Sequence, residues 1–326
     1  MERKRLGSTN FYVNQVGLGC MGFSHAYGLA EDRETAVKMI RKAYDMGYDF
    51  FDTAECYTGH FADGSISYNE ELVGEALKDV RDHVIIATKF GVIHRGTYLE
   101  LDSSPEKIRK SVEGSLKRLQ TDHIDLYYQH RVDPKVEPEV VAGVMKELIA
   151  EGKIRAWGIS EVKEEYLRRA HAVCPVTAIQ NRYSMMARWH EDMLSVCEEL
   201  GITFVAHSPL ANGMLSGKFD DKTNFSDDDF RKRMPQYTKE GYQKAKVLLD
   251  LLHQISDEKK CTMSQLSLAW MMCKKPFIVP IPGSRKESRI YENLHSADIK
   301  LTKEEVAKID EQLDSMTFDV FGGLNK

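Results

Sequence analysis

The most constraining feature of the sequence is a regular alternation of short apolar segments with amphipathic helical segments. The apolar segments are rich in β-branched residues and have the length of strands that are buried on both faces, as in a parallel sheet. They cover residues 16–19, 48–52, 84–89, 124–128, 154–160, 176–180, 202–206 and 277–280. Helical sequence follows each of them. Eight such units predict a (β/α)8 TIM barrel rather than an open sheet, with one domain over residues 1–326.

The sequence also predicts what surrounds the barrel. Residues 1–14 precede the first expected strand, and we expect them to form a hairpin that closes the barrel floor. Three stretches, residues 58–67, 219–239 and 316–326, lie outside the barrel pattern. We expect them to form long loops at the C-terminal face, where they would shape a pocket. Local signals mark helix starts, such as Ser104 at an N-cap position before a proline.

Charge and composition argue against several classes of function. The chain has 45 Lys and Arg against 50 Asp and Glu, a net charge of −5, which argues against nucleic acid or an anionic membrane as partner. No apolar run approaches the roughly 18 residues that span a bilayer, and no secretory signal is visible. The six cysteines are scattered, and the histidines lack a metal-binding spacing. We therefore expect a cytoplasmic protein without a metal site.

One glycine-rich motif, at residues 17–22 (GLGCMG), fits G-x-G-x-x-G after an expected strand. A dinucleotide-binding fingerprint requires a helix to begin there, so that its N-terminus faces the pyrophosphate. Residues 23–28 are typical of a loop instead. We therefore interpret the motif as a glycine-rich strand end that passes close to another part of the molecule, and not as the start of a Rossmann fold.

Polar side chains end successive expected strands, and together they define a candidate active site. Asp52 ends the second strand, with Tyr57 in the loop just beyond it, and Lys89 and His130 end the next two strands. In a (β/α)8 barrel these ends meet at one mouth. A cationic Lys89 would favour the phenolate and bring the pKa of Tyr57 down from about 10 into a useful range. Asp52 would keep Lys89 charged, and His130 could orient a substrate carbonyl. Each residue alone has a structural explanation, but their coincidence favours catalysis.

Several motifs in this order resemble the aldo-keto reductase family over nearly the whole chain. The matching segments are residues 47–57, 69–77, 86–89 and 122–130. The resemblance implies the (β/α)8 fold and the reduction of a small aldehyde or ketone by hydride from a nicotinamide cofactor. It further implies that Tyr57 is the general acid and that Asp52, Lys89 and His130 are its partners.

The same resemblance implies a cofactor site at the remaining strand ends. The residues expected at the nicotinamide and the pyrophosphate are Met21, Ser160, Glu161, Gln180, His207, Ser208, Leu210, Gly213 and Lys218. Ser160 and Gln180 would hold the carboxamide, and backbone N–H groups with Lys218 would meet the phosphates. Most members have asparagine where this chain has Glu161, which can accept a hydrogen bond but cannot donate one. An aromatic ring is common where this chain has His207, which would offer a planar stacking surface.

The turn after the last expected strand suits the adenosine end of the cofactor. Ser284, Arg285 and Arg289 stand there, and arginine is the strong bidentate partner of a phosphate. Cations at a helix N-terminus oppose the macrodipole, so a bound anion explains them better than a solvated turn. By resemblance, Glu292 and Asn293 would face the adenine. We therefore expect NADPH, with its 2′-phosphate, rather than NADH.

Two other functions stay open at this point. Some relatives of the family serve channels as regulatory subunits that bind the nicotinamide cofactor with little turnover, although the four intact catalytic residues argue against this role. A Schiff-base aldolase would use Lys89 as its nucleophile, but Asp52 beside it would keep the amine protonated. The sequence indicates neither a particular carbonyl substrate nor an oligomeric state.

Overall fold

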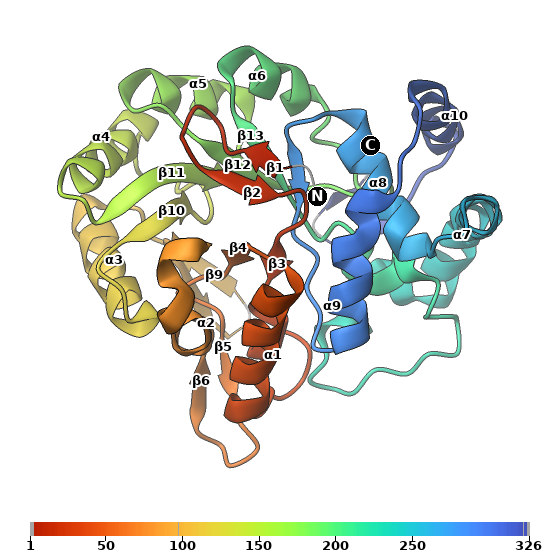
Figure 1. Cartoon of the computed structure of the whole chain (residues 1–326), viewed down its shortest axis with the longest axis horizontal. Helices are drawn as coiled ribbons and strands as arrows, with labels where there is room; N and C mark the ends of the chain where they lie inside the picture. The colour runs from red at the N-terminus through yellow and green to blue at the C-terminus, as the bar shows by residue number, and fades with distance from the viewer. Residues whose placement is uncertain (1–2, 97, 322, 325–326) are drawn as a thin grey trace.

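Eight parallel strands form a curled sheet at the centre of the molecule, with helices around its outside (Figure 1). The computed structural model describes residues 3–96, 98–321 and 323–324. In sheet order the strands are β3 (Leu18–Gly19), β4 (Phe50–Asp52), β7 (Ile85–Phe90), β10 (Ile124–Gln129), β11 (Ile154–Ser160), β12 (Ala178–Arg182), β13 (Thr203–His207) and β14 (Ile278–Pro280). The N–H of Gly17 donates to Pro280 O at 3.0 Å, so the two edges meet. The sheet therefore closes into the predicted (β/α)8 barrel.

Helical segments follow the barrel strands, as predicted. They are α1 (Arg33–Met46), α2 (Asn69–Leu77), α3 (Pro105–Leu119), α4 (Pro138–Ala150), α5 (Glu164–Val173), α6 (Asp192–Leu200), α7 (Lys239–Lys259), α8 (Met263–Lys274), α9 (Glu287–Leu294) and α10 (Lys303–Asp314). Local signals set several of their ends. Ser104 Oγ accepts from Lys107 N at 3.3 Å and caps α3 as predicted. Gly47 ends α1 with a φ of 114°, which favours glycine.

The barrel interior is a separate apolar core that a hairpin closes from below. Its members are Leu6, Val13, Phe50, Ala87, Leu126, Tyr128, Ala156, Ala178, Val205, Val279 and Ile281. The strands β1 (Arg3–Arg5) and β2 (Tyr12–Asn14) pair antiparallel, and the hairpin supplies Leu6 and Val13 to this core. The N–H of Gly7 donates to Thr203 Oγ1 at 2.7 Å, at the start of β13. The hairpin therefore closes the floor of the barrel, as predicted. The C-terminal ends of the strands lie at the opposite face.

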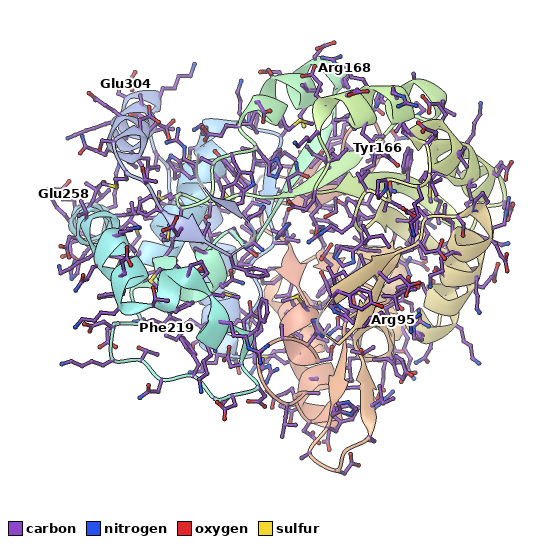
Figure 2. The ribbon with its side chains drawn as sticks, turned by 180° about the vertical axis from the view of Figure 1, so that it is seen from behind. Arg95, Tyr166, Arg168, Phe219, Glu258 and Glu304 are labelled. Carbon is purple, nitrogen blue, oxygen red and sulfur yellow. The ribbon has the colours of Figure 1, made fainter. Side chains whose placement is uncertain are left out.

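Short hairpins extend the barrel, and two of them lie where the sequence suggests long loops. They are β5 (Thr58–His60) with β6 (Ile66–Tyr68), β8 (Val92–Arg95) with β9 (Tyr98–Leu101), and β15 (Asp319–Val320) with β16 (Gly323–Leu324). The β8–β9 hairpin was not predicted. Arg95 on that hairpin and Phe219 on the long segment after β13 are both labelled in Figure 2. Residues 1–2, 322 and 325–326 of the expected segments lie outside the described residues.

The glycine-rich strand end is explained by a close approach of two backbones. A Cβ on Gly19 would lie 2.7 Å from Ile281 O, and a Cβ on Gly283 would lie 2.6 Å from Gly19 O. Beyond β3 the chain makes a 3-10 turn at Met21–Phe23, and the next helix, α1, begins only at Arg33. The motif therefore serves the closure of the barrel, and the Rossmann interpretation is excluded.

Three further observations concern membrane spans, metal-binding clusters and cysteines. Among the described residues, no helix is long and apolar enough to cross a membrane. The same part of the chain brings no group of three or more metal-binding side chains together. All six cysteines are free.

Candidate active site

Lys89 is the centre of a buried cluster at the C-terminal ends of neighbouring strands. Its Nζ donates to Asp52 Oδ1 at 2.5 Å, to Thr53 O at 2.8 Å and to Tyr57 Oη at 3.2 Å. Asp52 is the last residue of β4, and Lys89 precedes the last residue of β7. Lys89 is 0% exposed and Asp52 is 3% exposed. An ammonium group has three hydrogens, so every one of them is committed.

Burial and charge oppose each other in this ion pair. Burial raises the pKa of Asp52, although Lys89 acts in the opposite direction. Burial also disfavours the ammonium of Lys89, but Asp52 and Tyr57 outweigh it and raise the pKa of Lys89. Gln180 Nε2 donates to Asp52 Oδ2 at 2.7 Å and occupies the second carboxylate oxygen. Lys89 is therefore a fixed cation at neutral pH.

Tyr57 lies in the turn after β4, with its hydroxyl against Lys89. Burial raises the pKa of Tyr57 to about 12, and Lys89 opposes this rise without reversing it. The expectation that Lys89 brings this pKa down into a useful range is therefore wrong, because burial outweighs its effect. The physical reason is that the pocket removes water from the phenolate, while Lys89 shares its charge with Asp52 at 2.5 Å. Tyr57 keeps its proton at neutral pH, as a proton donor must.

His130 directly follows β10 and completes the cluster. Its ring meets the ring of Tyr57 edge to face, with 5.6 Å between the centroids. Its Nδ1 lies 3.4 Å from Cys56 Sγ. Burial lowers the pKa of His130 well below its usual value, and Arg131 and Lys89 act in the same direction. The structure therefore brings all four expected catalytic residues together, with His130 as a neutral imidazole.

A fully buried asparagine, Asn69, fixes the turn that carries Tyr57. Its Nδ2 donates to Cys20 O at 2.9 Å and to Ser24 Oγ at 2.8 Å, and its Oδ1 accepts from Thr53 Oγ1 at 2.6 Å. Its backbone N–H donates to Tyr57 O at 3.0 Å, and Ser24 Oγ donates to the same oxygen at 3.1 Å. Sequence reasoning missed this role. The available signal was the position of Asn69 at the start of an apolar pattern with helical spacing.

Two of the expected nicotinamide residues lie beside the cluster around Lys89. Ser160 and Gln180 face each other across β11 and β12, and both are almost fully buried. Ser160 Oγ accepts from Arg131 Nη1 at 3.2 Å. Gln180 donates to Asp52, so one of its amide hydrogens is already used. Gln180 therefore joins the cluster around Lys89 to the expected cofactor site.

Glu161 and His207, the two departures from the family pattern, also lie here. Glu161 Oε1 accepts from His207 Nε2 at 2.6 Å and from the backbone N–H of Arg182 at 2.8 Å. His207 ends β13 and is partly buried. The carboxylate is therefore engaged by protein donors at the place where a carboxamide contact was expected.

The expected pyrophosphate segment has an unusual backbone. Left-handed φ angles occur at Ser208, Ala211, Asn212 and Gly213. A Cβ on Gly213 would lie 2.8 Å from the ring of Phe219, so glycine is required there. Such conformations cluster at binding sites, where the surroundings fix them. Leu210 lies within this bent segment and is partly buried, while Lys218 follows it and is exposed.

Arg285 carries an unsatisfied donor at the expected adenosine end. Its Nε donates to Gly22 O, in the turn that also contains Met21. Its Nη2 is buried and has no hydrogen-bond partner within the described part of the chain. Burial lowers the pKa of Arg285, because the guanidinium is only partly compensated. Buried donors are rarely left unpaired, so this one fits the anionic group of a ligand.

The other expected residues of this end lie on or near α9. Arg289 Nη1 pairs with Glu292 Oε2 at 2.7 Å. Ser284 Oγ accepts from Lys286 N at 3.1 Å, and Asn293 is buried. Arg285 therefore has a buried donor without a partner among the described residues, and Arg289 is held in an ion pair.

Comparisons with known proteins agree with this architecture. The model of the Aldo/keto reductase family matches residues 15–314. A probable aldo-keto reductase 1 from Glycine max is 37% identical over 322 residues, which cover 98% of this chain and 90% of that protein. A glycerol dehydrogenase from Gluconobacter oxydans has a similar structure, with a TM-score of 0.84 at 28% identity over 96% of this chain and 95% of that one. An aldo/keto reductase from Klebsiella pneumoniae in complex with NADP and acetate has a TM-score of 0.69 at 27% identity, over 93% and 92% of the two chains. The chain therefore belongs to the aldo-keto reductase family of oxidoreductases.

Proposed function

We propose that this chain reduces the carbonyl group of an aldehyde or a ketone with NADPH, and that Tyr57 is the general acid. The observation that carries the proposal is the direction of the hydrogen bonds around Lys89. Because Lys89 Nζ donates to Tyr57 Oη, the phenol oxygen is the acceptor and its own O–H stays available for a substrate. A protonated phenol beside a fixed cation suits proton transfer to a carbonyl oxygen.

The roles of the four residues follow from their positions. NADPH, when bound, supplies the hydride for the carbonyl carbon. Tyr57 gives its proton to the carbonyl oxygen, so that the product is an alcohol, and Lys89 stabilises the phenolate until water returns the proton. Asp52 keeps Lys89 charged and directed at Tyr57. Because the Nδ1 of neutral His130 faces Cys56, its Nε2 is available to hydrogen-bond the carbonyl oxygen and orient it.

Features of the mouth support NADPH as the cofactor. We assign the 2′-phosphate to Arg285, whose buried Nη2 lacks a partner among the described residues, together with Ser284 and Arg289. We assign the remaining contacts to Met21, Ser160, Gln180 and His207 at the nicotinamide, Ser208, Leu210, Gly213 and Lys218 at the pyrophosphate, and Glu292 and Asn293 at the adenine. The Klebsiella pneumoniae relative was solved in complex with NADP, which supports this choice.

We further propose that the whole chain acts as one catalytic domain on a small-molecule carbonyl compound. The six free cysteines fit a reducing compartment such as the cytoplasm. A net charge of −5 gives no reason to expect a nucleic acid partner.

A fluorescence titration with NADPH and NADH, followed by a panel of simple aldehydes and ketones, tests the proposal. We expect saturable binding of NADPH and consumption of NADPH only when a carbonyl compound is present. Binding without turnover across the panel would instead favour a regulatory cofactor-binding protein. Covalent trapping of a carbonyl substrate by borohydride would favour a Schiff-base enzyme. Failure to bind NADPH would contradict the proposal.

A further inference from the structure

Glu161 and His207 occupy different strand ends, yet they contact each other. Glu161 follows β11 and His207 ends β13, with β12 between them in the sheet. Glu161 Oε1 lies 2.6 Å from His207 Nε2. In the sequence they are two unrelated departures from the expected cofactor site. In the structure they are the two halves of one interaction.

The carboxylate of Glu161 is held in place by further contacts. Its Oε1 also accepts from the backbone N–H of Arg182 at 2.8 Å, and its Oε2 lies 3.4 Å from His190 Nε2. Glu161 itself has a φ of 53°, which is uncommon for a residue other than glycine and needs support from its surroundings. The acceptor that meets His207 is therefore part of a fixed arrangement, and it has few positions open for a ligand.

Protonation states decide the direction of this hydrogen bond. Burial disfavours the charge of Glu161, but hydrogen bonds from His190 and His207 outweigh it and lower the pKa of Glu161 below its usual range. Burial lowers the pKa of His207 to about 4, although Glu161 acts in the opposite direction. At neutral pH an ionised carboxylate therefore accepts from a neutral imidazole, whose Nε2 carries the proton.

The second nitrogen of His207 has a partner as well. With the proton on Nε2, Nδ1 is an acceptor, and Ser208 Oγ lies 3.3 Å away from it. Contacts at both nitrogens restrict rotation of the ring about its side-chain torsions. Ser208 is also the first residue with a left-handed φ in the segment that continues to Gly213. The orientation of the ring is therefore tied to the start of that segment.

We propose that Glu161 is a positioning residue for His207, and that the two act as one unit that presents the face of the imidazole to the nicotinamide ring. This inference rests on the proposed cofactor site, which puts the nicotinamide against His207. It assigns Glu161 to the orientation of His207 instead of to the carboxamide. A ring that is fixed before the cofactor arrives loses less conformational freedom on binding, so the pair should increase the affinity for NADPH.

A double-mutant cycle on cofactor affinity tests the coupling. The variants are Glu161→Ala, His207→Phe and their combination, and the measured quantity is the dissociation constant of NADPH. We expect Glu161→Ala to raise it about fivefold or more when His207 is present, and less than about twofold in the His207→Phe background, because contacting residues do not act additively. Equal factors in the two backgrounds would overturn the proposal. Melting temperatures identify any variant that fails to fold.

Two further variants separate positioning from a general loss of charge. Glu161→Gln keeps an oxygen that can accept from His207 Nε2, so we expect it to retain most of the affinity that Glu161→Ala loses. An equal loss in both variants would count against the positioning role. Glu164→Ala is the matched control, because its carboxylate pairs at 2.8 Å with Arg168 on the outer helix α5 (Figure 2). It should leave the dissociation constant unchanged.

A measurement on the protein without cofactor separates this inference from the proposed function. Nitrogen NMR of isotopically labelled histidine reports which ring nitrogen of His207 carries the proton. We expect the proton on Nε2 in the wild-type protein and a mixture of tautomers in Glu161→Ala. A proton on Nδ1 in the wild type would overturn the proposal. If the wild type binds neither NADPH nor NADH, the proposed function fails, while the tautomer still shows whether Glu161 orients His207.

Discussion

Burial, more than neighbouring charge, sets the protonation of the proposed catalytic residues Tyr57 and His130. It raises the pKa of Tyr57 to about 12 and lowers that of His130 well below its usual value. Both side chains are therefore neutral at neutral pH, one as a phenol that can give a proton and the other as an imidazole that can donate a hydrogen bond. Because the pKa of Tyr57 is shifted upward and that of His130 downward, neither group titrates near neutral pH.

This arrangement predicts a flat pH profile for carbonyl reduction between about pH 6 and 9. Tyr57, with its raised pKa, keeps the proton until the pH approaches 12, so its ionisation should lower the rate only on the alkaline side. His207, with a pKa of about 4, and His130 gain charge only at acid pH. The measurement is kcat/KM for a simple aldehyde as a function of pH. A transition centred near neutral pH would mean that another group carries the proton.

Among the helices and strands, those that follow from a repeated pattern or from local signals could be predicted from the sequence. The eight β/α units follow from periodicity, and the cap at Ser104 follows from the residue type and the proline after it. The β5–β6 and β8–β9 hairpins have strands of three or four residues with mostly exposed or partly exposed side chains. Strands that short carry little apolar alternation, so their pattern is not visible in the sequence.

The candidate site also has features that could be predicted from the sequence and features that could not. The convergence of the four proposed catalytic residues could be predicted because barrel topology brings strand ends together. The bond from Gln180 to Asp52 and the pair of Glu161 with His207 depend on side-chain directions across strands, which no local pattern encodes. The pKa of Tyr57 was predicted in the wrong direction because the degree of burial cannot be read from a loop position.

The close approach of two backbones at the barrel closure can be tested by its effect on stability. Gly283→Ala would put a Cβ 2.6 Å from Gly19 O, so backbone must move, and we expect the free energy of unfolding to fall by about 1–3 kcal/mol. Gly143→Ala on α4 is the matched control, because nothing lies within 4 Å of its added Cβ. Alanine in a helix should leave stability unchanged or raise it by up to about 1 kcal/mol. Denaturant unfolding measures both, and equal effects would refute the close approach.

At the scale of the whole molecule, barrel closure and the proposed phosphate site use the same junction. Arg285 comes from the turn after β14, and its Nε contacts Gly22 O beyond β3, at the other end of the barrel sequence. The same guanidinium keeps Nη2 without a partner among the described residues. The proposed site for the 2′-phosphate therefore forms only when the first and last strands meet.

Cofactor choice should consequently depend on Arg285. Arg285→Met removes charge-assisted hydrogen bonds to a 2′-phosphate, so the dissociation constant of NADPH should rise about tenfold or more while that of NADH stays near its starting value. Lys286→Met, at the exposed neighbouring position, is the control and should change neither. We expect a smaller effect from Arg289→Ala, because Arg289 starts in an ion pair with Glu292. If Arg285→Met weakens the binding of NADPH and NADH equally, Arg285 does not recognise the 2′-phosphate.

The most direct test of the account is the turnover of Tyr57→Phe, which keeps the ring and removes only the hydroxyl. Tyr98→Phe is the control, because Tyr98 is 62% exposed on the β8–β9 hairpin. The measurement follows the consumption of NADPH with a saturating aldehyde, together with the dissociation constant of NADPH. We expect Tyr57→Phe to lower kcat by about 10²–10⁴-fold with nearly unchanged NADPH binding, and Tyr98→Phe to behave as wild type. Reduction of the aldehyde by Tyr57→Phe at the wild-type rate would contradict the proposal that Tyr57 is the general acid.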